Sequence, residues 1–115
     1  MIPAMAATPA AETAFGAIAC VTRRKLLDAL AEKERSVGDL VGVARVSQPA
    51  VSQHLKVLRE AGLVGERREG RFRYYRLRAE PLAEVLAWVR SYERFWEERL
   101  TALGRVLDDD ERRVR

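Results

Sequence analysis

The stretch from Ser47 to Leu63 has residue types and a spacing that suit contact with DNA. Val51, Leu55 and Leu58 recur at the spacing of a helix and predict an apolar stripe. The opposite face lacks acidic residues and carries Pro49, Ser52, Gln53, Lys56 and Arg59. Hydroxyl, amide and cationic groups reach base edges and phosphates when a helix lies in a major groove. The stretch therefore predicts a DNA-reading helix, with an ordinary solvated surface helix as the alternative.

The ends of this helix are marked by local signals. Ser47 or Gln48 suits the N-cap, and Pro49 suits the first turn, where a missing amide hydrogen costs nothing. Gly62 suits the other end, because glycine readily takes the left-handed conformation that closes a helix. We expect a helix that begins and ends within this stretch.

The residues before this helix predict a helix-turn-helix. A first helix is expected from near Glu12, with Phe15 on its apolar side, and a second with Thr22 as N-cap and Arg23, Arg24 and Lys25 in its first turn. Ser36 is expected to cap a short third helix, and a turn through residues 42–46 then leads into the reading helix. The cations near Thr22 suggest a phosphate contact, with simple solvation as the favoured alternative.

After Gly62 the pattern changes from a helical to a strand period. Residues 63–69 and 71–78 predict two strands joined at Glu69-Gly70, a β-hairpin wing. Its end is basic, with Arg67 and Arg68 before the turn and Arg71 and Arg73 after it. These side chains suit contact with backbone phosphates or a minor groove. The alternative is that the charges only protect an exposed hairpin from edge pairing.

A long apolar series follows Pro81, which is expected to open one continuous final helix. The series includes Leu82, Leu86, Val89, Trp96, Leu100 and Leu103, and Tyr92 lies beside it. Such a stripe has more apolar surface than one neighbouring element covers. We expect two copies of the chain to form a symmetric dimer through this helix, with Phe15 of the first helix also in the interface. The alternative is that the final helix folds back onto its own domain.

Composition limits the remaining classes of function. The chain has 115 residues and a formal charge of +4, which fits one domain and a polyanionic partner. With one cysteine, Cys20, and one histidine, His54, it offers no disulfide, no cysteine cluster for zinc and no nucleophile with a base, so we expect no enzyme and no cofactor. We expect a disordered tail over 1–11, one domain over 12–109 and a charged tail over 110–115. The sequence predicts neither a secretion signal nor a membrane span, so we expect the protein in the cytoplasm.

Three segments together resemble the ArsR/SmtB winged helix-turn-helix regulators. They are Thr-Arg-Arg-Lys-Leu-Leu from Thr22, Ser-Gln-Pro-Ala-Val-Ser-Gln-His-Leu-Lys-Val-Leu-Arg-Glu-Ala-Gly-Leu-Val from Ser47, and Gly-Arg-Phe-Arg-Tyr-Tyr-Arg-Leu from Gly70. The resemblance implies a homodimer that binds imperfect palindromes near promoters and usually represses until an effector releases it. By position it implies DNA contacts from the reading helix and the wing, through Gln48, Ser52, Gln53, His54, Arg71, Arg73 and Tyr74.

The chain departs from this family at the usual metal sites. Ser36 and Gly38 stand where soft-metal sensors have Cys-x-Cys. At the other common site, between paired last helices, the matching residues are Ala79, Pro81, Tyr92 and Phe95, none of which binds zinc well. We therefore expect no metal site of the known kinds.

Cys20 and His54 leave two alternatives open. Cys20 stands in place of an acid frequent in the family and is interpreted as a small buried residue, with a redox-sensing thiol as the alternative. His54 is interpreted as a hydrogen-bond donor to a backbone or phosphate oxygen, with a weak nickel or zinc site shared with acids as the alternative.

These observations predict a mainly α fold with a β-hairpin wing (α+β), a winged helix-turn-helix that dimerises through its N- and C-terminal helices. The predicted DNA-binding residues are Ser47, Gln48, Ser52, Gln53, His54, Lys56, Arg67, Arg68, Arg71, Arg73 and Tyr74. The predicted partners are double-stranded operator DNA and a second copy of the chain. The predicted function is transcriptional repression, with activation as the alternative. One hypothesis is constitutive or concentration-controlled DNA binding, tuned by a partner protein that carries the sensing chemistry. The others are direct metal or redox sensing, and a dimerisation module that binds no DNA.

Overall fold

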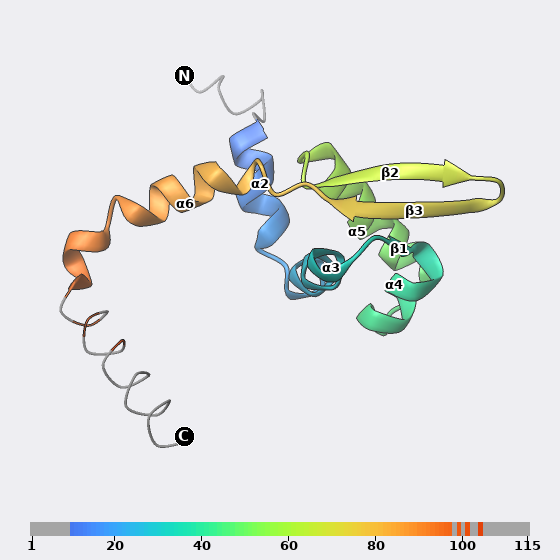
Figure 1. Ribbon diagram of the computed structural model, residues 1–115, viewed down its shortest axis with the longest axis horizontal. Coiled ribbons are helices and arrows are strands. Elements are labelled where there is room, and N and C mark those ends of the chain that lie inside the picture. The colour runs from blue at the N-terminus through green and yellow to red at the C-terminus, as the bar shows by residue number, and fades with distance from the viewer. Residues whose placement is uncertain (1–9, 98, 100, 102–103, 105–115) are drawn as a thin grey trace, which may run out of the picture. The chain divides into compact units, whose positions relative to one another are not determined.

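The fold is described from a computed structural model for residues 10–97, 99, 101 and 104. In chain order the elements are α2 (Ala10–Ile18), α3 (Val21–Glu32), β1 (Arg35–Ser36), α4 (Val37–Ala44), α5 (Gln48–Glu60), β2 (Val64–Glu69), β3 (Phe72–Leu77), α6 (Leu82–Arg90) and the short 3-10 helix η1 (Glu93–Phe95). Contacts divide the chain into two compact units, Met1–Val85 and Leu86–Arg115. In the first unit the hairpin of β2 and β3 extends past α4 and α5 (Figure 1).

The core of the first unit confirms the predicted apolar faces of the helices. Val51, Leu55 and Leu58 of α5 are at most 1% exposed, as are Leu26 of α3 and Leu40 of α4. They form one cluster, and Leu82 at the start of α6 packs against it. The polar face of α5 therefore points away from the core, because the two faces of a helix diverge by half a turn.

The predicted limits of α5 are confirmed in detail. Ser47 is the N-cap, and its hydroxyl accepts a hydrogen bond from the Ala50 amide at 3.3 Å. At the other end the Leu63 amide donates to Leu58 O at 2.9 Å and the Gly62 amide to Arg59 O at 2.9 Å. This is a Schellman motif, and it requires the positive φ of Gly62, 77°. Both limits of α5 are thus fixed by local hydrogen bonds.

The limits of the other helices were predicted less well. Ser36 caps α4 as expected, through a hydrogen bond from the Asp39 amide. The prediction of Thr22 as N-cap was wrong, because α3 already begins at Val21 and Cys20 is the N-cap. The first helix begins at Ala10, two residues inside the predicted tail, and α4 runs to Ala44, so the turn before α5 is shorter than predicted. Most of both predicted tails lies outside the described residues.

The wing is part of a three-stranded antiparallel sheet in the order β1-β3-β2. The predicted hairpin is confirmed, with Glu69 opposite Phe72 and a two-residue turn at Gly70 and Arg71. Gly70 has φ 62°, which the first turn position needs and which glycine adopts without strain. Arg71 therefore belongs to the turn and not to the strand. The two-residue strand β1, which pairs Arg35 with Tyr75 and Ser36 with Tyr74, was not predicted.

The prediction of one continuous final helix was wrong. The helix α6 ends at Arg90, and a turn and η1 follow. The Ser91 hydroxyl donates to Trp88 O at 2.6 Å, and the Tyr92 amide bonds Val89 O, so both replace regular helical bonds. The predicted interface residues Leu100 and Leu103 lie outside the described residues. Among the described helices, none combines the length and apolar character needed to span a membrane.

Candidate nucleic-acid interface

A groove of about 250 Å³ runs between the polar face of α5 and the wing. It is lined by Pro49, Ser52, Gln53, Lys56 and Arg59 of α5 and by Arg73 and Tyr75 of β3. The structure thus brings the predicted Ser52, Gln53 and Lys56 together with the predicted Arg73. No acidic residue lines this groove, and although Glu66 contacts its Arg59 and Arg73 from outside, the three cations leave a net positive charge that suits a polyanion.

The sheet register decides which arginines of the wing face α5. Directly opposite residues share a face, and successive residues alternate. Arg68 lies opposite Arg73, on the same face as the buried Tyr75 and as Leu77, which packs on the core. Arg67 lies opposite Tyr74, on the other face. The predicted set of wing residues is therefore divided between two faces of the sheet.

Arg67 is held by contacts within the chain. It donates to Glu34 at 2.6 Å and also to Glu69, and its guanidinium lies 4.7 Å from the centre of the Tyr74 ring. The bond from Arg67 holds the pKa of Glu34 below its usual value, and Glu34 in turn raises the pKa of Arg67. Arg67 and Tyr74, both predicted as DNA contacts, thus lie outside the groove.

Glu66 connects α5 to the wing and was missed by the sequence analysis. Its carboxylate accepts hydrogen bonds from Arg59 at 3.1 Å and from the Tyr75 hydroxyl at 2.9 Å, and Arg73 approaches it to 3.7 Å. Burial, followed by the bond to Glu66, raises the pKa of Tyr75. The strand alternation that places Glu66 and Tyr75 on one face was the available signal. Glu66 thereby positions Arg73 beside α5.

His54 points to α3 and does not line the groove. The Arg23 Nη1 donates to His54 Nδ1 at 3.3 Å, so this ring nitrogen is the acceptor, because a guanidinium group can only donate. Arg23 also donates to Ala17 O at 2.7 Å and to Gly16 O at 3.1 Å, at the end of α2. Simple solvation, which the sequence favoured over a phosphate contact for these cations, is thus wrong for Arg23, because its contacts join α2 to α5.

We expect Arg23→Ala to lower the free energy of unfolding by about 2 kcal/mol, because three charge-assisted or bridging hydrogen bonds are lost. Arg23→Lys is expected to restore only part of this, since an ammonium group lacks the planar fork of the guanidinium. Urea unfolding followed by circular dichroism measures the difference. Arg24→Ala is the control, because the Arg24 side chain is exposed and, within the described residues, has a single hydrogen bond, to Ile18 O. Equal losses in the two alanine variants would contradict the special role of Arg23.

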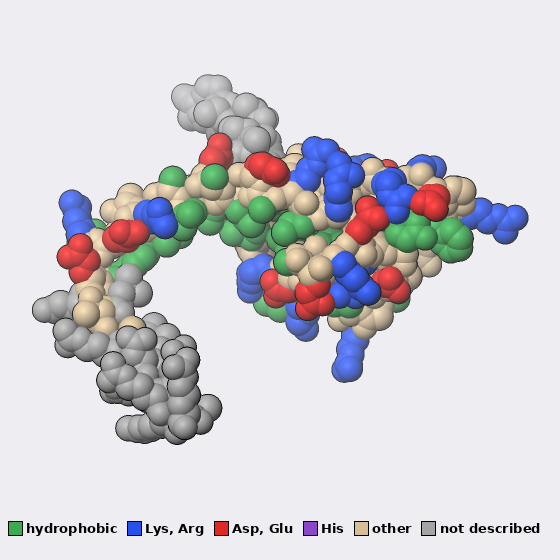
Figure 2. Space-filling model, in the orientation of Figure 1, with side chains coloured by type: hydrophobic (Ala, Val, Ile, Leu, Met, Phe, Trp, Pro, Cys, Tyr) green, Lys and Arg blue, Asp and Glu red, His purple; other side chains and the backbone are tan. Residues whose placement is uncertain are grey.

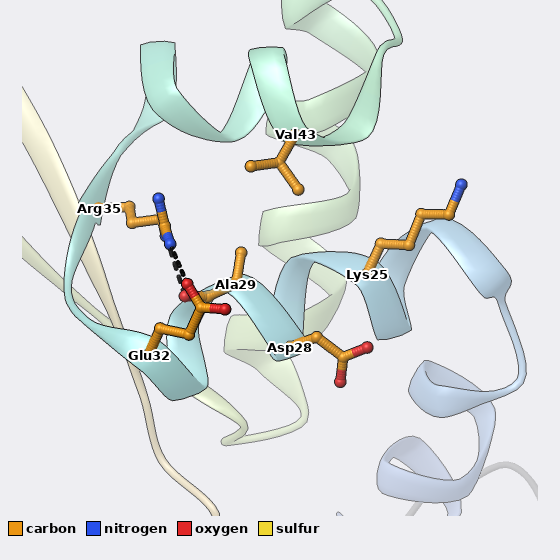
Figure 3. Close-up of a pocket in the computed structure, with 6 residues that line it drawn as sticks. All are labelled: Lys25, Asp28, Ala29, Glu32, Arg35 and Val43. Atoms are coloured by element: carbon orange, nitrogen blue, oxygen red, sulfur yellow. Dashed lines mark hydrogen bonds and ion pairs between the residues drawn. The ribbon is translucent and has the colours of Figure 1, made fainter.

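A further pocket, of about 280 Å³, has mixed charge (Figure 3). It lies between α3 and α4 and is lined by Lys25, Asp28, Ala29, Glu32, Arg35 and Val43. Arg35 bonds the carboxylate of Glu32 at 2.7 Å, and Lys25 extends away from both acids. Interspersed acids and bases make this pocket unsuited to a polyanion, in contrast to the groove beside α5.

The residues at the family's usual metal positions do not fit a metal. Ser36 is engaged in capping α4 and Gly38 has no side chain. Within the described residues, no group of three or more His, Cys, Asp and Glu side chains could hold a metal ion. Cys20 is half-buried at the start of α3, where the Arg23 amide lowers the pKa of its thiol, although the sulfur makes no capping hydrogen bond. It is thus less buried than predicted.

The second unit exposes large apolar side chains. Leu86 is 50% exposed and Phe95 62%, and Trp88 and Tyr92 are exposed as well. Hydrophobic side chains gather along one side of α6 in Figure 2. Tyr92 is in ring contact with both Trp88 and Phe95, at centroid distances of 5.5 and 6.0 Å. Of the predicted interface, Leu86 and Tyr92 are exposed, whereas Leu82, Val89, Trp96 and Phe15 are half-buried. Trp88, which is 56% exposed, is not among the residues predicted for the interface.

The helix pair α4 and α5, followed by the hairpin, defines a winged helix-turn-helix protein of the kind that regulates transcription. Residues 20–66 match the family described as "Bacterial regulatory protein, arsR family". The chain is 39% identical to HTH-type transcriptional regulator Rv2034 of Mycobacterium tuberculosis, over 86% of this chain and 90% of that protein. It is 35% identical to transcriptional repressor SdpR of Bacillus subtilis, over 68% of this chain and 87% of that protein. The chain therefore belongs to the ArsR family of transcriptional regulators.

A solved structure agrees with this assignment. The homodimeric winged helix-turn-helix DNA-binding domain of Mb0332 from Mycobacterium bovis superposes with a TM-score of 0.62 at 28% identity. The match covers 84% of this chain and 92% of that one. The predicted winged helix-turn-helix fold is confirmed, and the family is one of transcriptional regulators and not of enzymes, as predicted. Dimerisation through the N- and C-terminal helices stays a prediction.

Proposed function

We propose that the protein is a homodimeric repressor that binds a pseudo-palindromic operator through the groove between α5 and β3. The observation that carries this proposal is the acid-free lining of that groove, where amide, hydroxyl and cationic groups of α5 face Arg73 of the wing. Similarity to the repressor SdpR and to the homodimeric domain of Mb0332 supports repression and dimerisation. As DNA is the proposed ligand, the cytoplasm is the proposed compartment.

In this proposal the groove residues have separate roles. Ser52 and Gln53 read base edges, because their hydroxyl and amide groups donate and accept hydrogen bonds in a major groove. Lys56, Arg68 and Arg73 bind phosphates and fix the position of α5 on the duplex. Ser47 acts indirectly, since its hydroxyl caps α5. His54 orients α5 through Arg23. Two copies present two reading helices about one helical turn of DNA apart.

Gln53→Ala and Arg73→Ala are expected to have different effects on DNA binding. Gln53→Ala changes the preferred sequence, because it removes a group that reads bases. Arg73→Ala weakens binding to all sequences and lowers the slope of log K against log salt by about one, because it removes one phosphate contact. Fluorescence anisotropy on operator and scrambled duplexes, across a salt series, measures both effects. The operator is first located by footprinting on the DNA upstream of the protein's own gene.

The result with unaltered protein also tests the proposal as a whole. A chain that forms dimers but gives no salt-dependent shift of any duplex would be a dimerisation module without DNA binding. Uniform weakening by Gln53→Ala, without a change in preference, would remove the base-reading role of α5. Arg67→Ala is the control, because Arg67 lies on the other face of the wing and is paired with Glu34.

Effector sensing is proposed to come from a partner protein, because the family's metal positions lack ligands in this chain. The competing candidate is direct sensing by metal or oxidant. The cationic Arg23 beside His54 Nδ1 disfavours a metal there, whereas the lowered pKa of the Cys20 thiol favours oxidation. Anisotropy measured with nickel, zinc or peroxide separates the candidates, since only direct sensing changes the DNA affinity of the isolated protein.

A further inference from the structure

Two arginines at the base of the wing, Arg76 and Arg78, converge over a glycine. Gly65 of β2 lies opposite Arg76 of β3. A Cβ at Gly65 would lie 3.0 Å from Arg78 Nε and 3.3 Å from Arg76 Cζ. Both guanidinium groups thus occupy space that the side chain of any other residue at this position would need. Like charges at short distance repel, so this arginine pair suits an anion that lies between the two groups.

The arginine pair lies on the face of the sheet opposite the groove beside α5. Successive residues of a strand point to alternate faces, so Arg76 points away from the face that carries Arg73 and Tyr75. A duplex held in the groove would have the sheet between itself and the pair. The arginine pair is therefore separate from the proposed DNA-binding surface.

No acid neutralises the arginine pair in the part of the chain that the structure describes. Both residues are exposed, and neither side chain has an ion pair or a hydrogen bond to another described residue. The acids near this face, Glu34 and Glu69, both accept hydrogen bonds from Arg67. The bond from Arg67, and after it the charges of Arg67 and Arg76, hold the pKa of Glu34 below its usual value. The pair therefore keeps charge for an external anion.

The strand edge beside the arginine pair is open. β2 is an outer strand of the sheet, whose order is β1-β3-β2 (Figure 1). The Arg78 amide donates to Leu63 O at 2.8 Å, and from this pair every second residue of β2 bonds β3. The backbone N–H and C=O groups of Glu66 and Arg68 therefore point outward, without a backbone partner among the described residues. An extended peptide can pair with such an edge and add a strand to the sheet.

We propose that an acidic, extended segment of a partner protein docks at this site. Its backbone pairs with the outer edge of β2, and one of its carboxylates binds Arg76 and Arg78 above Gly65. A residue opposite Gly65 in the added strand carries its side chain on the face of the arginine pair, because directly opposite residues share a face. Guanidinium groups bind carboxylates through paired, charge-assisted hydrogen bonds. The inference rests on the proposed function and deepens it, since it gives the site and the chemistry of the partner to which sensing is assigned.

A labelled acidic peptide tests the carboxylate contact. The probe is a fluorescein-labelled hexapeptide of alternating glutamate and threonine, and its anisotropy is measured with the full chain. We expect Arg76→Gln and Arg78→Gln each to reduce its affinity by about fivefold or more, because each removes a charge-assisted contact. Arg68→Gln removes the same charge from the other face of the wing and is expected to stay within about twofold. Equal losses in all three variants would overturn the site, and so would equal binding of a peptide with glutamine in place of glutamate.

Gly65→Ala tests the convergence of the two arginines without a change in charge. The added Cβ meets only flexible ends of side chains, and Gly65 has no positive φ, so the fold is expected to stay intact. The guanidinium groups must then move apart, and we expect the affinity for the peptide to fall about threefold or more, because paired hydrogen bonds depend on geometry. Thermal unfolding checks the fold. Unchanged affinity would overturn the placement of the carboxylate above Gly65.

Amide hydrogen exchange tests the pairing with β2. The peptide is expected to slow exchange at Glu66 and Arg68, whose amides point outward, and to leave Arg67 unchanged, because its amide already bonds β3. Unchanged exchange at both outward amides would overturn the added strand.

Operator DNA separates this site from the DNA-binding surface. Saturation with operator is expected to leave the affinity for the peptide within about threefold at 0.15 M salt, where screening limits distant charges. Arg76→Gln is likewise expected to bind operator within about twofold of unaltered protein. Displacement of the peptide by the duplex would overturn the proposal. Failure of the proposed function is distinguishable, because then the unaltered protein binds no duplex, whatever the peptide does.

Discussion

Leu86→Glu combined with Phe95→Glu is expected to convert the protein from a dimer into a monomer. Both side chains are at least half exposed in a unit that presents several aromatic rings. A dimer interface would bury these side chains, and a buried unpaired carboxylate is strongly unfavourable. Sedimentation equilibrium measures the change in mass. Because both sites are exposed, the fold of the first unit is expected to remain intact.

The same double variant is expected to lose about a hundredfold or more in operator affinity. Two linked reading helices bind with an avidity that a single helix lacks, even when each makes the same contacts. Ala87→Glu is the matched control, because Ala87 is exposed and faces away from Leu82 and Leu86 on α6. A double variant that remains dimeric would show that the interface lies elsewhere, for example along α2.

Leu55→Ala is expected to lower the free energy of unfolding by about 2–5 kcal/mol, which is a large part of the stability of a small domain. Leu55 is 1% exposed and belongs to the main core cluster, so the substitution leaves a cavity among tightly packed side chains. Urea unfolding measures the loss. Gln53→Ala, two residues away on the exposed face of α5, is expected to change stability by less than about 0.5 kcal/mol.

This pair of variants separates the two faces of α5. Leu55→Ala reduces DNA binding only through the unfolded fraction, so its affinity per folded molecule stays unchanged. Gln53→Ala alters DNA preference at unchanged stability. If Leu55→Ala were as stable as the unaltered protein, α5 would not be packed in the way the structure shows.

Features set by short segments of chain were predictable from the sequence. The limits and faces of α5 follow from Ser47, Pro49, Gly62 and the apolar spacing, which act within a few residues. The same holds for the Ser36 cap of α4 and for the hairpin at Gly70. The end of α6 is also local, but it was not predicted. At Ser91 the side-chain hydroxyl donates to the Trp88 carbonyl, which would otherwise accept a helical bond from the backbone, and the helix ends there.

The tertiary structure decided the contacts between segments that are distant in the sequence. Arg67 meets Glu34 and His54 meets Arg23, in pairs that are 33 and 31 residues apart, and no local pattern specifies either. These contacts remove Arg67, Tyr74 and His54 from the groove, whereas Glu66 holds Arg73 beside α5. The sequence by itself determined the helix, its polar face and the basic wing, because periodicity and capping are local. Only packing and sheet register, which depend on the whole domain, decided which of those charges face the groove.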